Sequence, residues 1–207
     1  MREDGMDEVT DQDDGLRARK RRDTLERITE AGLRLFIEQG FEATTLDAIA
    51  EASGISRRTF FAYFKSKDEV LLGRDGSGFA EALRPALLAQ PADLTPLETL
   101  HHCFLELASR YESDESIVVD RILRSTEALR QRKEALFVAM ESQVAETLYR
   151  RWPQPERRPE LRMAAMIGMG TLRLAIEAWR QDEGARPLAD HIAQGFLLLE
   201  TIQEPGT

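Results

Sequence analysis

The spacing of the apolar residues is the feature that most constrains how this chain can fold. Apolar side chains recur at intervals of three and four almost throughout, and runs of β-branched or aromatic residues with an interval of two are absent. The first spacing places apolar side chains on one face of an α-helix, whereas a half-buried strand needs the second. The chain is therefore predicted to be all-α.

Interruptions of this pattern set the expected helix ends. The first helix follows the basic segment 17–22 and ends at Gly40, and two short helices end at Gly54 and near Phe64. A fourth helix begins at Ser66, and the glycines at 73, 76 and 78 predict a bend or break before residues 79–89. Later helices are expected at about 96–111, 115–123, 125–151, 159–182 and 187–203.

Four helix starts carry a residue whose side chain can accept a hydrogen bond from a free backbone N–H. These expected N-caps are Thr44, Ser56, Ser66 and Thr95. All except Ser56 have an acidic residue three positions later, which is the spacing of a capping box.

The two short helices have the steric pattern of a helix-turn-helix, in which two helices cross at close range through a tight turn. Ala50 gives the small residue needed at the crossing, and Gly54 tolerates the left-handed backbone of the turn. Small Ser53 permits close approach. The apolar residues expected to lock the pair are Leu46, Ile49, Ile55 and Phe60.

The second of these helices divides into an inner and an outer face. Phe60 and Phe64 are four residues apart and should point inward. Arg58 lies on the outer face, where an arginine can donate two hydrogen bonds to guanine in a major groove; the alternative is ordinary solvated charge. Residues at the edges of this face, including Thr44 or Thr45, could bind phosphates. The full set of candidate DNA-contacting residues is Thr44, Thr45, Arg57, Arg58, Thr59, Phe61, Tyr63 and Lys67.

Charge is distributed unevenly along a chain whose net charge is −9. Residues 1–16 carry −6 and are expected to form a disordered acidic tail. Residues 17–67 carry +4 and form the expected DNA-binding domain, whereas residues 68–207 carry −7 and form the expected second helical domain. The sequence RARKRR at 17–22 is interpreted either as a soluble helix start or as a basic arm over the minor groove or the backbone.

The stretch GFEATTLDAIAEASGISRRTFFAYFKSKDEVL, residues 40–71, resembles the DNA-binding domain of the tetracycline-repressor (TetR) family. The matching residues are Gly40-Phe41, Thr44-Thr45, Ile49-Ala50, Ser53-Gly54-Ile55-Ser56, Tyr63-Phe64 and Ser66-Lys67. One position departs from the family pattern, because Phe61 stands where a tyrosine commonly contacts phosphate. The resemblance implies a ligand-responsive transcriptional regulator, expected to be a repressor that binds a palindromic operator as a homodimer and is released by a small apolar or acyl-type effector.

The sequence RRTFF at 57–61, with the later LRSTEALRQRKEALF and IEAW, also resembles an actinobacterial subgroup related to mycofactocin-associated regulators, and this resemblance is looser over residues 90–203. Acyl-coenzyme A ligands have been implicated in that subgroup. The family resemblance implies a helical ligand-binding and dimerisation domain in which residues 163–179 and 189–202 form a four-helix interface with a second subunit. The alternative is a central helix of a monomeric core. The candidate effector-binding residues are Phe104, Leu107, Phe137 and Met166.

Several other functions lack support in the sequence. No nucleophile–base pattern, phosphate-binding glycine loop or metal-ligand spacing is present, so we expect no enzyme, no cofactor and no metal. The adjacent His101, His102 and Cys103 point about 100° apart on a helix and cannot converge on one ion. Because the chain has a single cysteine and lacks a secretory signal and any apolar run of about 20 residues, we expect a cytoplasmic protein without membrane contact. The rival interpretations are a helical interaction module that regulates a partner protein and a helical acyl-binding enzyme.

Overall fold

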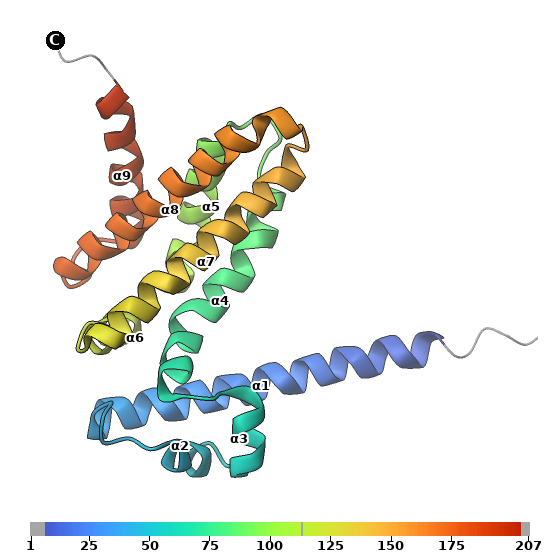
Figure 1. Ribbon diagram of the computed structural model, residues 1–207, viewed down its shortest axis with the longest axis vertical. Coiled ribbons are helices and arrows are strands. Elements are labelled where there is room, and N and C mark those ends of the chain that lie inside the picture. The colour runs from blue at the N-terminus through green and yellow to red at the C-terminus, as the bar shows by residue number, and fades with distance from the viewer. Residues whose placement is uncertain (1–6, 113, 204–207) are drawn as a thin grey trace, which may run out of the picture. The chain divides into compact units, whose positions relative to one another are not determined.

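The computed structural model describes residues 7–112 and 114–203, and every regular element in these ranges is helical (Figure 1). This confirms the all-α prediction. The chain divides into two compact units, Met1–Arg74 and Asp75–Thr207. In chain order the elements are α1 (Asp7–Gln39), α2 (Leu46–Ala52), α3 (Arg57–Tyr63), α4 (Lys67–Ala89), α5 (Pro96–Tyr111), α6 (Asp114–Leu123), α7 (Glu127–Arg151), a short 3-10 helix (Pro155–Arg157), α8 (Arg158–Gln181) and α9 (Leu188–Gln203).

The first and fourth helices differ from the sequence-based expectation. Helix α1 begins at Asp7, so residues 7–16 are helical where a disordered tail was predicted, and they contain no proline that would end a helix. Residues 1–6 lie outside the described residues. Helix α4 runs unbroken from Lys67 to Ala89 through the glycines at which a bend or break was expected. A glycine inside a helix weakens it by only about 1 kcal/mol, which packing elsewhere along a long helix can offset. The boundary between the two units falls inside α4, whereas the sequence placed it at residue 67.

The N-terminal unit packs α1, α2, α3 and the start of α4 around a small apolar core. Ile28, Phe36, Ile49 and Phe60 are all buried there, as the spacing of apolar residues predicts. Gly32 lets α1 and α4 approach closely, because a Cβ at that position would lie 2.5 Å from Cγ1 of Val70. The packing of this face of α1 therefore positions the two short helices, α2 and α3.

The caps of the short helices position them. Ser56 caps α3 by accepting a hydrogen bond from the N–H of Thr59 at 3.1 Å, as predicted. The cap of α2 is Thr45, whose Oγ1 accepts from the N–H of Ala48, and the expected cap Thr44 has another role. The Thr44 hydroxyl donates to the carbonyls of Leu35 and Gly40, which ties the start of α2 to the end of α1.

The turn between α2 and α3 is built on Gly54, which has a φ of +66°. The N–H of Ile55 donates to the carbonyl of Ala50, and the N–H of Gly54 donates to the carbonyl of Glu51. This pair of bonds is a Schellman motif, which satisfies the last carbonyls of a helix when the following residue is left-handed. The chain therefore reverses direction between two adjacent short helices, as a helix-turn-helix requires.

The C-terminal unit is organised around α8, which packs against α5, α7 and α9 (Figure 1). Its core includes Phe104, Leu148, Leu161 and Trp179. Helix α5 begins with the predicted capping box, in which Thr95 and Glu98 each accept a hydrogen bond from the other residue's N–H. This core holds the faces of α7 and α8 that line the pocket described below.

The candidate metal cluster on α5 separates into unrelated environments. Cys103 is buried, and burial raises the pKa of its thiol to about 12. His101 stacks on Phe196 of α9, and burial, assisted by nearby His102, lowers the pKa of the His101 imidazole. Within residues 7–112 and 114–203, no group of three or more His, Cys, Asp or Glu side chains is placed to hold a metal ion. None of the helices described there is long and apolar enough to cross a membrane.

The left-handed turn at Gly54 gives a direct stability prediction. Gly54→Ala should lower the free energy of unfolding by about 1–2 kcal/mol, because a Cβ disfavours positive φ. Gly54→Asn should lose less, since asparagine tolerates this conformation better. Equilibrium urea unfolding of the full chain measures both variants. A Gly54→Ala protein as stable as the parent would contradict the turn geometry.

Candidate DNA-binding surface and effector pocket

Helix α3 presents a polar and basic face to solvent. Arg57, Arg58, Thr59 and Ala62 are exposed, and Phe61 is 41% exposed, whereas Phe60 beneath them is fully buried. Within the described part of the chain, the Arg58 side chain makes no hydrogen bond or ion pair, so its guanidinium is available to a ligand. Arg58, which the sequence placed on the outer face of this helix, is therefore exposed together with Arg57, Thr59 and Phe61.

Arg57 is held in place by its neighbours. Its Nε lies 3.0 Å from Oδ1 of Asp47 on α2, and its guanidinium lies over the ring of Phe61 at 5.6 Å from the centroid. Both partners of the ion pair are well exposed, so this pair adds little stability and a phosphate can compete for the arginine. Phe61, which is itself partly exposed, thus also contacts and positions an arginine.

Three of the expected edge contacts have more specific roles. Thr44 is only 1% exposed, with its hydroxyl used inside the fold, so it is not positioned to reach phosphate; Thr45 is exposed beside it. Lys67 donates from Nζ to the carbonyls of Phe41 and Glu42, at 2.7 and 3.1 Å. The lysine therefore ties the start of α4 to the loop before α2, the helix that Thr45 caps.

The basic segment 17–22 lies next to the exposed face of α3. It is part of α1, and Arg19, Lys20, Arg21 and Arg22 are exposed. The Arg21 guanidinium lies over the ring of Tyr63, the last residue of α3, at 5.4 Å from its centroid. The basic residues of α1 therefore extend the positively charged surface that α3 presents.

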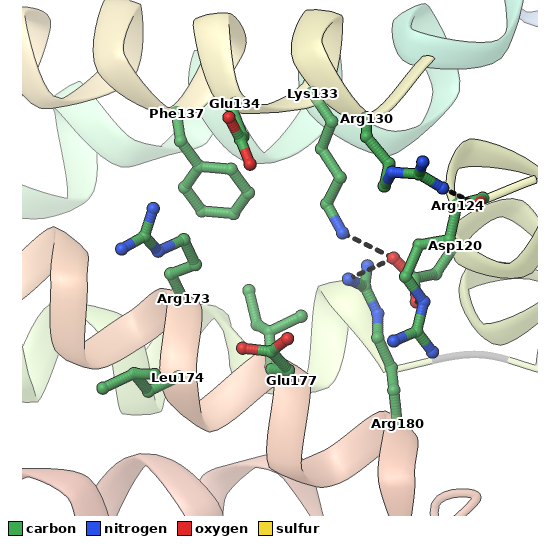
Figure 2. A pocket seen from close by; sticks show the side chains of 11 residues that line it. Asp120, Arg124, Arg130, Lys133, Glu134, Phe137, Arg173, Leu174, Glu177 and Arg180 are labelled. Carbon is green, nitrogen blue, oxygen red and sulfur yellow. Dashed lines mark hydrogen bonds and ion pairs between the residues drawn. The ribbon is translucent and has the colours of Figure 1, made fainter. Parts of the chain in front are cut away.

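A pocket of about 290 Å³ opens in the C-terminal unit between α6, α7 and α8 (Figure 2). Its apolar lining consists of Phe137, Leu174 and Ile176. The charged lining residues are five cations and three acids, namely Arg124, Arg130, Lys133, Arg173, Arg180, Asp120, Glu134 and Glu177. This mixture suits a ligand with both an apolar body and a charged group.

One end of the pocket is organised by the buried carboxylate of Asp120 on α6, which is 3% exposed. Its Oδ1 lies 2.7 Å from Nη1 of Arg180 on α8 and 2.5 Å from Nζ of Lys133 on α7. Oδ2 lies 3.1 Å from Nε of Arg124. One carboxylate therefore ties three segments of the chain together, as Figure 2 shows for the first two contacts.

Of the four effector-binding residues predicted from sequence, the pocket contains Phe137 alone. Phe104 and Leu107 lie in the core, and Met166 is 47% exposed on α8. Their contact with an effector stays a prediction. Sequence reasoning missed Asp120, although an acid inside the apolar run SIVVDRIL is a signal that a charge is buried on a helix.

Helices α8 and α9 pack against each other and also leave large apolar side chains exposed. These are Met163, Met166, Leu174, Leu197, Leu198 and Ile202. Exposed apolar residues gathered on two neighbouring helices are typical of a protein–protein interface.

The fold and these surfaces define a class of protein: a helix-turn-helix DNA-binding unit followed by a separate helical unit. Residues 28–73 match the sequence model of the family described as "Bacterial regulatory proteins, tetR family". Residues 28–73 therefore form a DNA-binding domain of the TetR type, which is found in bacterial regulatory proteins.

Individual relatives agree with this assignment. The HTH-type transcriptional regulator TcmR of Streptomyces glaucescens is 40% identical over 109 residues, which are 53% of this chain and 48% of TcmR. The putative mycofactocin biosynthesis transcriptional regulator MftR of Mycobacterium tuberculosis is 34% identical over 87 residues, with 34% of this chain and 44% of MftR covered. The chain thus spans half or less of the length of these curated relatives.

A solved structure extends the likeness over both units. FadR of Thermus thermophilus, a TetR-family transcriptional repressor in complex with lauroyl-CoA, has a TM-score of 0.56 and 29% identity to this chain. The similarity covers 88% of this chain and 96% of that one. The arrangement of the C-terminal helices is therefore also that of a TetR-family protein.

The buried charge cluster predicts a large effect of one carboxylate on stability. Asp120→Ala should lower the free energy of unfolding by about 3–5 kcal/mol, because it leaves buried cations without their partner. Glu160→Ala removes an exposed carboxylate bound to Arg157 and should change stability by less than about 1 kcal/mol. Thermal or urea unfolding compares the two variants, and equal losses would contradict the described role of Asp120.

Proposed function

We propose that the chain is a homodimeric repressor that acts in the cytoplasm and binds a near-palindromic DNA operator through α3. The observation that carries this proposal is the exposed face of α3, on which Arg58 has no competing partner among the described residues. An arginine at this place can donate two hydrogen bonds to guanine O6 and N7 in the major groove. Arg57, Thr59 and Phe61 would contact neighbouring bases or sugars, and Thr45, Tyr63 and Lys67 would contact the backbone.

The basic segment 17–22 fits the phosphate backbone better than the minor groove. It is helical in this structure, and an α-helix with its side chains is about 10–12 Å wide. A minor groove of about 6 Å does not admit such a helix. The exposed cations beside Tyr63 would therefore contact phosphates that flank the half-site, which adds affinity without reading sequence.

Dimerisation is proposed through α8 and α9, whose exposed methionine, leucine and isoleucine side chains would be buried against a second copy of the chain. Two copies related by a two-fold axis would form a four-helix interface. The same symmetry would place two α3 helices on half-sites one helical turn apart or a multiple of it, which explains why a near-palindrome is expected.

The effector is proposed to be a small apolar or acyl-type molecule that binds in the C-terminal unit and releases the DNA. The lauroyl-CoA bound to the similar Thermus thermophilus repressor supports an acyl-type ligand. Helix α4 begins in the N-terminal unit and ends in the C-terminal one, so it is the covalent route between them. The ligand can weaken DNA binding only by as much as its affinity differs between the two states of the dimer.

The role of Arg58 is tested by substitution. Arg58→Ala should weaken binding to DNA from the region upstream of the protein's own gene by about 1–3 kcal/mol and relax specificity at one base pair. Arg150→Ala, an exposed arginine of the C-terminal unit, is the matched control for loss of charge and should leave binding unchanged. Gel-shift titrations measure both. An Arg58→Ala protein with unchanged affinity and specificity would reject the base contact.

The interface is tested by placing a charge on it. Leu198→Asp should convert the protein to a monomer, since an unpaired carboxylate is strongly disfavoured in a buried apolar contact. Val138→Asp introduces the same charge at an exposed apolar residue of α7 and should leave the dimer intact. Sedimentation velocity distinguishes the two species. A dimeric Leu198→Asp protein, or a monomeric parent, would contradict this interface.

A further inference from the structure

The pocket between α6, α7 and α8 is amphipathic, and its charged groups differ in how far they are already engaged. Arg124, Lys133 and Arg180 all contact the carboxylate of Asp120. Arg130 is bound to Glu127, which lies outside the pocket, at 2.6 Å. The cations at this end therefore have structural partners, and binding an anion there would disturb the contacts that tie the segments together.

Arg173 is in a different situation. It lies on α8, on the other side of the pocket from Asp120, and Figure 2 shows its side chain extending toward Phe137 of α7. Within residues 7–112 and 114–203, no ion pair or hydrogen bond holds its guanidinium. An anion can therefore bind Arg173 without displacing an existing partner.

The apolar part of the lining adjoins this arginine. Phe137 is partly buried against the core, Ile176 is buried, and Leu174 neighbours Arg173 on α8. The acids Glu134 and Glu177 also line the pocket and repel an anion that approaches them. Figure 2 shows both acids between Arg173 and the Asp120 cluster, so a negative charge and an apolar body are best accommodated together at the Arg173 end.

We propose that this pocket takes an amphipathic anion, whose carboxylate, sulfonate or phosphate group pairs with Arg173 while its apolar body packs on Phe137 and Ile176. A guanidinium is suited to this role because its planar donors can bind two oxygens of one anionic group. The volume of about 290 Å³ limits the body to a few rings or a medium-length alkyl chain. The identification of this anion as the effector rests on the proposed function.

The test uses two fluorescent probes with the same ring skeleton. 8-Anilinonaphthalene-1-sulfonate carries an anionic group, whereas N-phenyl-1-naphthylamine lacks it. The full-length protein, without DNA, should bind the sulfonate about tenfold more tightly than the neutral amine, as a charge-assisted contact predicts. Arg173→Gln should weaken the sulfonate about tenfold and change the amine less than about twofold.

Further variants separate the pocket from adventitious binding. Arg173→Lys keeps the charge without the planar fork and should retain part of the sulfonate preference. Phe137→Ala should weaken both probes, because both share the apolar body. Arg150→Gln, an exposed arginine on α7 that does not line the pocket, should leave both unchanged. Thermal unfolding verifies that each variant is folded.

The proposal is overturned if the amine binds as tightly as the sulfonate, or if Arg173→Gln leaves sulfonate affinity unchanged or weakens both probes equally. Such results in a protein that still binds DNA would reject the anionic ligand, whereas the proposed function as a DNA-binding regulator would stand. A retained sulfonate preference in a protein that binds no DNA would reject the regulator and leave the pocket's ligand class in place.

Discussion

The reversal of the chain at Gly54 is the constraint on which the DNA-binding surface depends. A φ of +66° lets the last carbonyls of α2 be satisfied by the N–H groups of Gly54 and Ile55 while the chain turns into α3. Phe60 is then buried in the N-terminal core, so Arg57, Arg58 and Phe61 must face solvent. The orientation of the basic face thus follows from one backbone conformation and one buried ring.

Charge is used differently for the two proposed functions in different parts of the chain. Residues 17–67 carry +4 within a protein whose net charge is −9, so the net attraction to the phosphates of DNA is strongest in the unit that contains α3. In the C-terminal unit, charge is used differently: one buried carboxylate, Asp120, joins α6, α7 and α8 at one end of a pocket. A ligand that packs between α7 and α8 would act on the helices this cluster holds.

Much of the fold and of the DNA-binding surface could be predicted from sequence, because both depend on local patterns. Gly54, Ser56 and Phe60 have roles fixed by residues within one or two helical turns of them. The cap of α2 was predicted at Thr44 and lies at Thr45, because the choice between them depends on a distant carbonyl, that of Leu35, to which Thr44 donates. Of the residues that line the pocket, sequence reasoning predicted Phe137 alone, since Asp120, Lys133 and Arg180 meet only through tertiary packing. Phe104 and Leu107 have side chains suited to a pocket and lie in the buried core of the C-terminal unit, and their contact with an effector stays a prediction.

Selection of bound duplexes from a random DNA pool tests the central claim most directly, because it presupposes no operator. We expect enrichment of a near-palindromic sequence whose half-sites are about one helical turn apart, or a multiple of it, with a guanine in each half-site. Binding of the enriched duplex should also weaken steeply as salt rises, as phosphate contacts require. A purified protein that enriches no sequence even at low salt would contradict the account.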